Sequence, residues 1–286
     1  MSDFLRQMAV ASAARAAAIF PSDGGVDAVT PLVSDGFMLI AEFKRVSPAA
    51  GVLSASGDPT LVLRAQSGAY ARGGATAISV LTEPTRFGGS LTDLHAAATI
   101  ARAAGLPVMR KDFLVDASQI HEARAFGASG VLLIARMLDD DRLFEMATLT
   151  RRLGMFALIE AFDEAEVERS AGVHEAVMKE PDNAAGPALL LGLNCRDLAT
   201  LRIDVSVFDR AAATVRALAE RGSGIKVIAE SGLETSADVA RVAAAGYAGA
   251  LVGSSLMRAA DSAAACRQMV IAASKAVGAV APGSKR

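Results

Sequence analysis

The stretch from Leu39 to Pro48 reads LIAEFKRVSP, an apolar run that ends in two opposite charges. Its first three residues are typical of the interior of a buried strand. Glu42 and Lys44 then follow two positions apart, and side chains with that spacing on a strand point to the same face. The stretch therefore predicts a strand that presents an acid and a base side by side at its carboxyl end.

Seven more short apolar runs follow along the chain, and helical patterns such as 116–127, 138–153 and 235–247 separate several of them. We expect strands at 38–43, 76–81, 107–110, 130–135, 155–160, 188–194, 225–230 and 249–253. Alternation of strand and helix indicates parallel strands covered by helices. Eight such units in a chain of 286 residues predict a (β/α)8 TIM barrel.

The alternative α/β architecture is an open, doubly wound sheet. That fold would normally carry a glycine-rich nucleotide-binding turn after its first strand, where this chain has KRVSPAAG instead. At the helix ends, Asp116 and Thr235 are expected N-caps, and Gly127 and Gly246 are expected at helix termini. The barrel is therefore the architecture that the pattern favours.

Composition suits one globular domain over residues 1–286, since 52% of the residues are hydrophobic and 21% are charged. Within it we expect a helical extension at 1–35 and a disordered tail at 280–286. The formal net charge of −2 lacks the basic excess of a nucleic-acid surface. No apolar run approaches the about 18 residues of a membrane span, and the N-terminus is interpreted as an amphipathic helix rather than a sorting signal.

The cysteines and histidines are few and scattered. Two cysteines, Cys195 and Cys266, indicate a reducing compartment, and no metal-ligand spacing links them to the three histidines. None of the histidines ends an expected strand, so we interpret all three as structural or solvated. Cys195 lies between Asn194 and Arg196 and is expected to face away from them as a small packing residue.

Polar residues recur where the apolar runs stop. They are Glu42, Lys44, Arg110, Lys111, Asp112, Glu160, Asn194, Glu230, Ser231, Gly253 and Ser254. In a TIM barrel the carboxyl ends of all strands form one rim, and active sites lie there. We therefore expect these side chains to meet at the mouth of the barrel.

The last two strands end in AESG (229–232) and VGSS (252–255). In many TIM barrels these two loops bind a phosphate group, since small residues let the backbone N–H groups approach an anion. Gly232, Gly253 and Ser254 are the expected donors. The alternative is that both stretches are ordinary glycine–serine turns that only connect elements.

Two further strand ends suggest acid–base chemistry. Lys111, in MRKDF, is either a solvated rim lysine or a general acid whose proton affinity falls through burial and a neighbouring cation. Glu160, which ends FALIE, is either a capping residue or a base. Asn194 suits orienting a hydroxyl or carbonyl group, and Arg196 pairs with a substrate carboxylate or with a surface acid. FGGS (87–90) either lines the site or forms a turn before the next helix.

With these residues in place, the chain resembles the indole-3-glycerol phosphate synthase family. Eight blocks carry the resemblance in order between Leu39 and Arg258: IAEFKRVSP, AISVLTEPTRFGGS, PVMRKDF, VLLIARML, ALIEAFDE, GLNCRDL, IAESGL and LVGSSLMR. The resemblance implies a TIM barrel with an extra N-terminal helix and no metal or organic cofactor. It also implies a sugar-phosphate substrate, a cytoplasmic location, and a monomer or weak homo-oligomer.

The reaction that the resemblance implies is a carboxy-lyase step of tryptophan biosynthesis (EC 4.1.1.48). It closes the ring of 1-(2-carboxyphenylamino)-1-deoxyribulose 5-phosphate and gives indole-3-glycerol phosphate, CO2 and water. In that reaction Lys111 would protonate the ketone oxygen, Lys44 would contact the carboxylate, and Glu160 would move protons during dehydration. Glu42, Asn194 and Glu230 would orient groups and stabilise charge.

The resemblance assigns the remaining residues to substrate binding. The phosphate cradle would be Ser231, Gly232, Gly253 and Ser254, the apolar wall would be Phe87, Phe113 and Leu132, and Arg196 would lie near the carboxylate. Two features depart from the family. The segment 173–191 is longer than the usual link between the fifth helix and the sixth strand. The N-terminal segment lacks the family's Lys/Glu pattern, which leaves open whether its helix touches the substrate.

Two other functions fit the sequence less well. Another phosphate-binding barrel, such as phosphoribosylanthranilate isomerase, would use a Cys/Asp pair rather than Lys111 with Glu160. A non-catalytic barrel that binds a sugar phosphate should have lost Lys44, Lys111 or Glu160, and this chain carries all three.

Overall fold

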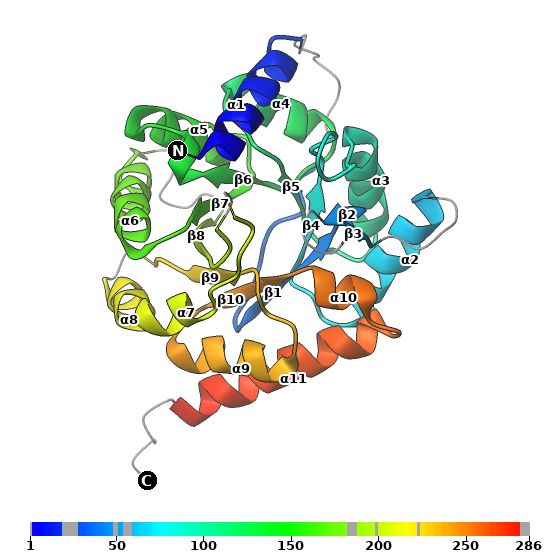
Figure 1. Cartoon of the computed structure of the whole chain (residues 1–286), viewed down its shortest axis with the longest axis vertical. Helices are drawn as coiled ribbons and strands as arrows, with labels where there is room; N and C mark the ends of the chain where they lie inside the picture. Colours follow the sequence, from blue (N-terminus) through cyan, green and yellow to red (C-terminus); the bar gives the residue numbers. More distant parts are fainter. Residues whose placement is uncertain are drawn as a thin grey trace.

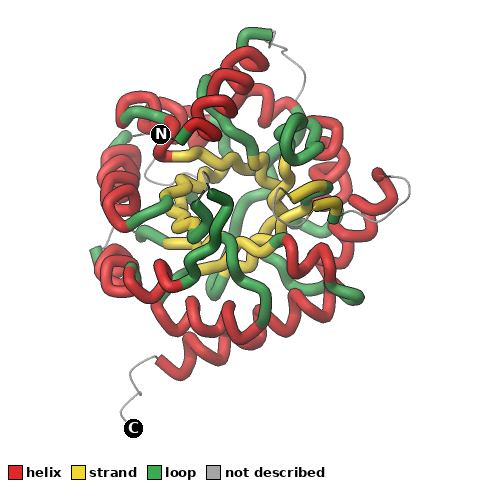
Figure 2. The backbone as a smooth tube through the Cα atoms, viewed as in Figure 1, coloured by secondary structure: helices red, strands yellow, loops and turns green. Residues whose placement is uncertain are grey.

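The computed structural model describes residues 2–18, 28–47, 51–53, 59–181, 188–197, 200–221 and 224–280. Eight parallel strands close into a barrel in the order β1-β10-β9-β8-β7-β6-β5-β4 (Figures 1 and 2). They are β1 Met38–Phe43, β4 Ala77–Leu81, β5 Val108–Lys111, β6 Gly130–Ile134, β7 Phe156–Ala161, β8 Leu189–Asn194, β9 Val227–Glu230 and β10 Gly249–Val252. The predicted TIM barrel is confirmed, and no strand bound moves by more than two residues.

Helices surround the barrel on its outer side (Figure 1). They are α1 Asp3–Ala16, α2 Pro59–Arg72, α3 Leu91–Arg102, α4 Ala117–Ala125, α5 Asp140–Arg152, α6 Glu164–Met178, α7 Ser206–Arg210, α8 Ala212–Glu220, α9 Ser236–Ala245, α10 Ser254–Arg258 and α11 Ser262–Val280, with a 3₁₀ turn η1 Ala135–Met137. Asp116 and Thr235 each form a capping box, and α9 ends at Gly246 with φ of 106°. These caps are the predicted ones, because a short polar side chain can accept the first free N–H groups of a helix.

The alternation of side chains along β1 explains how the barrel core and the site are connected. Leu39, Ala41 and Phe43 point outward and pack against the helices. Met38 and Ile40 point into the barrel, and Glu42 continues the same inward row. The inward row of β1 is therefore apolar at the base of the barrel and charged at its mouth.

Two parts of the sequence-based picture change. A short hairpin, β2 Val46–Ser47 with β3 Gly51–Val52, follows β1 and was not expected. The long link assigned to 173–191 is wrong at its start, because α6 continues to Met178 and the connection to β8 begins only after it.

At the chain ends, α1 is the helical part of the expected extension at 1–35, and residues 28–35 hold no helix or strand. The expected disordered tail lies outside the described residues except for Val280, which ends α11. Among the described residues no helix has the length and apolar character that a membrane span requires.

Candidate active site

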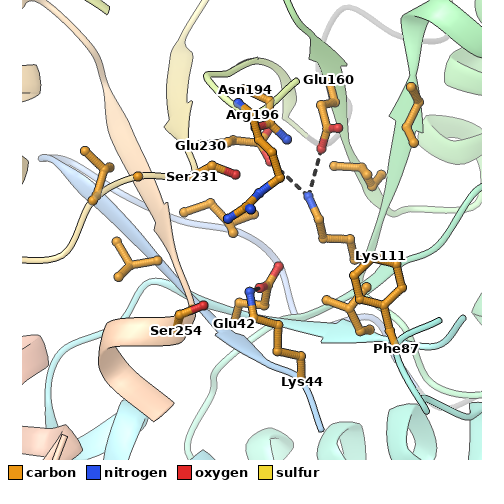
Figure 3. Close-up of a pocket in the computed structure, with 18 of the residues that line it drawn as sticks. Glu42, Lys44, Phe87, Lys111, Glu160, Asn194, Arg196, Glu230, Ser231 and Ser254 are labelled. Carbon is orange, nitrogen blue, oxygen red and sulfur yellow. Dashed lines mark hydrogen bonds and ion pairs between the residues drawn. The ribbon is translucent and has the colours of Figure 1, made fainter. Parts of the chain in front are cut away.

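A cavity of about 110 Å³ opens at the carboxyl ends of the strands. Every residue predicted for catalysis or substrate binding lines it: Glu42, Lys44, Phe87, Lys111, Phe113, Leu132, Glu160, Asn194, Arg196, Glu230, Ser231, Gly232, Gly253 and Ser254. The expectation that Arg110 also lies at the mouth is wrong, because its side chain is buried in ion pairs with Asp112 and Glu122 and does not line the cavity. Figure 3 shows charged side chains at its centre, with Ser231 and Ser254 on one side and Phe87 on the other. The barrel thus gathers residues that lie more than 200 positions apart in the chain.

Lys111 lies between two carboxylates at the centre of the pocket. Its Nζ donates to Glu160 Oε2 at 2.8 Å and to Glu230 Oε2 at 3.0 Å (Figure 3). Burial alone would lower the pKa of Lys111, but Glu160, Glu230 and Glu42 outweigh it and raise that pKa above its ordinary value. The expectation of reduced proton affinity is therefore wrong: the neighbouring carboxylates keep Lys111 as a charged ammonium.

Glu230, in contrast to the charged Lys111, is shifted toward its neutral form. Burial raises its pKa to about 8; Lys111 lowers that pKa, whereas the like charge of Glu160 raises it. Its second oxygen, Oε1, has no hydrogen-bond partner among the described residues. A Cβ on Gly192 would lie 1.9 Å from this oxygen, so the glycine in β8 is what makes room for the carboxylate.

The pair that ends β1 forms as the sequence predicts. Lys44 Nζ donates to Glu42 Oε1 at 2.6 Å, and both side chains line the pocket. Burial alone would raise the pKa of Glu42, but Lys44 and Lys111 outweigh it and hold that pKa below its ordinary value. A Cβ on Gly253 would lie 2.5 Å from Glu42 Oε1, so this glycine is required by the ion pair whether or not it binds phosphate.

Asn194 ends β8 and Arg196 follows two residues later, on the same side of the pocket (Figure 3). The backbone N–H of Arg196 donates to Asn194 Oδ1 at 2.9 Å, and its guanidinium donates to the Leu201 carbonyl at 3.3 Å. Cys195 points the other way into the core, and burial raises the pKa of its thiol to about 12. Its predicted role as a packing residue is confirmed.

The expected phosphate side is built from two turns. Ser231 and Gly232, after β9, both have left-handed backbones, with φ of 69° and 68°. Such a conformation is costly for serine, and strained backbone of this kind concentrates at binding sites. On the same side of the pocket, Gly253 immediately precedes Ser254, the first residue of α10.

The aromatic side of the pocket includes a residue that sequence reasoning missed. Phe87 and Phe113 lie with ring centroids 6.2 Å apart, and Phe4 of α1 meets Phe113 edge-on at 5.8 Å. All three line the cavity, together with Leu132. From the sequence, a substrate contact by α1 was considered only through the Lys/Glu pattern that the helix lacks. The feature that indicates a substrate contact is instead Phe4, an aromatic residue in the first turn of the helix.

Among the described residues no group of three or more His, Cys, Asp or Glu side chains could hold a metal ion. None of the three histidines lines the pocket: His174 is buried in α6, and His95 packs edge-on against Phe126. Within the described residues the pocket therefore offers ammonium, guanidinium, carboxylate and hydroxyl groups for its chemistry.

Known proteins match this chain in sequence and in fold. The family model for indole-3-glycerol phosphate synthase matches residues 13–269. The enzyme of that name from Micrococcus luteus is 46% identical over 223 residues, which are 78% of this chain and 74% of that protein. The one from Mycobacterium leprae is 42% identical over 260 residues, 91% and 85% of the two chains.

A solved structure supports the architecture alone. Thiamine phosphate pyrophosphorylase from Pyrococcus furiosus superposes with a TM-score of 0.55 at 16% identity, covering 85% of this chain and 97% of the other. At that identity the likeness concerns the barrel and carries no statement about substrate.

Proposed function

The chain belongs to the indole-3-glycerol phosphate synthase family, and from that premise we propose how its pocket residues divide the family's reaction. The enzyme is a carboxy-lyase of tryptophan biosynthesis. Its substrate carries an aromatic carboxylate at one end, a ketone in the middle and a phosphate at the other end. The observation that carries the proposal is Lys111 held between Glu160 and Glu230 at the centre of the cavity.

In the proposed ring closure, the aromatic carbon that bears the carboxylate attacks the ketone carbon. Negative charge develops on the ketone oxygen, and a positioned cation stabilises it where water could not. Lys111 supplies that cation and then transfers a proton to the oxygen. Its raised pKa keeps it charged until attack begins, while an alkoxide is basic enough to take the proton.

The substrate carboxylate is proposed to lie beside Lys44 and Arg196, which are cations that also line the pocket. Once the new carbon–carbon bond has formed, the bond to the carboxyl group breaks and CO2 leaves. The electron pair of that bond restores the aromatic ring. Lys44 is already paired with Glu42, which holds its charge in place before the substrate arrives.

The last step removes the new hydroxyl group as water. We assign the accompanying proton transfers to Glu160, which shares Lys111 with Glu230. Glu42, Asn194 and Glu230 orient the reacting groups and balance charge. This division of roles is supported by the way the carboxylates converge on Lys111 from three different strands.

The two ends of the substrate are proposed to bind at opposite sides of the cavity. The phosphate would lie against Ser231, Gly232, Gly253 and Ser254, and the arylamine ring would lie against Phe87, Phe113, Leu132 and Phe4. Holding both ends brings the ring carbon close to the ketone carbon and keeps the intermediate bound for the second step. We further propose a monomer or weak homo-oligomer that acts in the cytoplasm and, given its net charge of −2, binds no nucleic acid.

The test is a fluorescence assay for indole product with purified protein and 1-(2-carboxyphenylamino)-1-deoxyribulose 5-phosphate, beside an analogue without the carboxylate. Turnover of the substrate alone is expected, with no added metal and in the presence of EDTA. Ser254→Asp should raise KM steeply through repulsion of the phosphate. An unchanged KM would move the phosphate site elsewhere, and activity abolished by EDTA would contradict the cofactor-free mechanism.

A further inference from the structure

Glu83 is a fully buried carboxylate two residues after the end of β4, and the proposed mechanism gives it no role. It begins a loop of residues 83–89, which we call the Glu83 loop. Its Oε1 accepts from the backbone N–H of Thr85 at 2.8 Å and from the Thr85 hydroxyl at 2.5 Å. Its Oε2 accepts from the N–H groups of Arg86 at 2.6 Å and Phe87 at 3.2 Å. One side chain therefore holds three consecutive backbone groups.

The same residue also closes the far end of the loop. Its carbonyl oxygen accepts from the N–H of Gly89 at 3.0 Å. Gly88 has φ of 62°, and a Cβ on Gly89 would lie 2.1 Å from the carbonyl oxygen of Leu81, so only glycine lets the chain fold back here. The Glu83 loop is thus a closed ring of chain built around one carboxylate.

This ring is attached to the strand that carries Lys111. The N–H of Thr82 donates to the Lys111 carbonyl at 3.0 Å, and the Thr82 hydroxyl donates to Asp112 Oδ2 at 2.8 Å. The closed loop fixes the position of Phe87, whose side chain lines the pocket. The side chain of Glu83 itself does not line the pocket. Any effect of Glu83 on the substrate must therefore pass through Phe87.

Burying a carboxylate costs free energy unless its oxygens are hydrogen-bonded, and a turn that only reverses the chain does not need a buried charge. The four donors that satisfy it are uncharged, and three of them are backbone groups whose places are set by the loop itself. Hydrogen bonds to an ionised acceptor are roughly twice as strong as neutral ones. The four hydrogen bonds to Glu83 therefore favour one conformation of the Glu83 loop over other conformations of the same loop.

We propose that Glu83 is a positioning residue for the aryl end of the substrate: it fixes Phe87 so that the arylamine ring is held in the orientation that ring closure needs. This inference rests on the aromatic wall proposed above. A misplacement of about 1 Å in a positioning group can cost about a hundredfold in rate.

The main variant is Glu83→Gln, which puts an amide NH2 group where an acceptor of N–H groups was. We expect kcat/KM for the substrate to fall about tenfold to a hundredfold, because the ring carbon no longer meets the ketone carbon. The affinity for inorganic phosphate, measured by calorimetry, should change less than about twofold, because the phosphate side lies across the pocket. A parallel loss of phosphate affinity would show a general structural defect and overturn the proposal.

Glu166→Gln is the matched control. Glu166 also accepts a backbone N–H after a strand, from Phe162 at 2.9 Å, and pairs with Arg136, but it does not line the pocket. It should lower thermal stability while leaving kcat/KM within about twofold. A loss as large as that of Glu83→Gln would mean that any such carboxylate has the same effect, and would overturn the assignment.

A double-mutant cycle with Phe87→Ala decides whether Glu83 acts through the ring. Coupled residues show non-additive effects. On the Phe87→Ala background, Glu83→Gln should change kcat/KM by less than about threefold. Thr85→Ala, at an exposed position that the fold tolerates, removes one of the four bonds and should follow the same pattern with a smaller loss.

Additive losses in that cycle would overturn the role of Glu83 and leave the aromatic wall intact. A Phe87→Ala variant with unchanged kcat/KM would overturn both the wall and the inference built on it. Failure of the wild-type protein to turn the substrate over would instead count against the proposed function, so the outcomes are distinguishable.

Discussion

The end of β5 carries two ion clusters on opposite faces of one strand. The pocket cluster is Lys111 with Glu160 and Glu230, facing the cavity. The buried cluster is Arg110 with Asp112 and Glu122, facing the helices, with Arg15 of α1 added at 2.7 Å from Asp112. Both place a cation between two carboxylates. All three residues of the pocket cluster line the cavity, whereas of the buried cluster only Asp112 does, and its side chain is 1% exposed.

The difference lies in how many donors are already committed. Arg110 donates to Thr82, to the Gln119 carbonyl and to both carboxylates of its cluster, and its side chain is 2% exposed. Lys111 has three N–H groups and is 16% exposed. Two of them go to Glu160 and Glu230, so in the described part of the chain the third is available to a substrate oxygen. A saturated cluster stabilises the fold, and an unsaturated one can do chemistry.

Removing the cation of the pocket cluster should have the largest effect. Lys111→Ala is expected to lower kcat by about 10²–10⁴-fold, the range for loss of a general acid. Affinity for a product-like phosphate should fall far less, because the phosphate side is untouched. The measurement is steady-state kinetics beside calorimetry with indole-3-glycerol phosphate. Equal losses in both would reassign Lys111 to ground-state binding.

Removing the cation of the buried cluster should instead damage stability. Arg110→Met leaves Asp112 and Glu122 without their main partner and should lower the free energy of unfolding by about 3–5 kcal/mol. Urea denaturation measures it, with Arg210→Met as control, because the pair of Arg210 with Asp204 is exposed to solvent and contributes little to stability. If Arg110→Met kept wild-type stability and lost activity, the contrast between the clusters would be wrong.

The pH dependence of stability sharpens the comparison through Glu230. Its folded pKa of about 8 lies above its ordinary value of 4.5, so the folded state binds the proton more tightly. The tighter binding of this proton stabilises the folded state at low pH, and the stabilisation is lost as pH rises from 4.5 to about 8. Glu230→Gln removes it, so the variant should gain stability relative to wild type between pH 5 and pH 8. Denaturation curves that shift in parallel at both pH values would contradict the assignment.

The smallest effect is expected where the buried cluster reaches α1. Arg15 is 30% exposed, so Arg15→Ala should cost about 1 kcal/mol in unfolding free energy and loosen α1. Phe4 would then hold the aryl side of the pocket less well, and KM should rise about twofold to threefold while kcat changes little. Limited proteolysis within α1 should quicken. Unchanged proteolysis and KM would show that other contacts dock this helix.

Much of this architecture could be predicted from short patterns. The apolar composition of runs such as ALLLGLN (188–194) predicts strands, and the polar residues that follow predict where the strands end. Because all strands of a TIM barrel run the same way, knowing the ends was enough to predict most of the residues that share the mouth. It failed for Arg110, whose side chain points to the helices instead. The helix end at Met178 was missed, since the stretch after Val173 mixes apolar and charged residues without a clear stop signal.

The sequence by itself determined the barrel, the inward row that ends in Glu42 and Lys44, and most of the residues around the cavity, because period-two alternation and the polar end of each strand are local information. Only the tertiary structure decided the charge state of Lys111, the room that Gly192 and Gly253 leave for carboxylates, and the arrival of Phe4. Each of these depends on distances between segments far apart in the chain. Electrostatic and steric energies follow such distances, which the residue types alone do not specify.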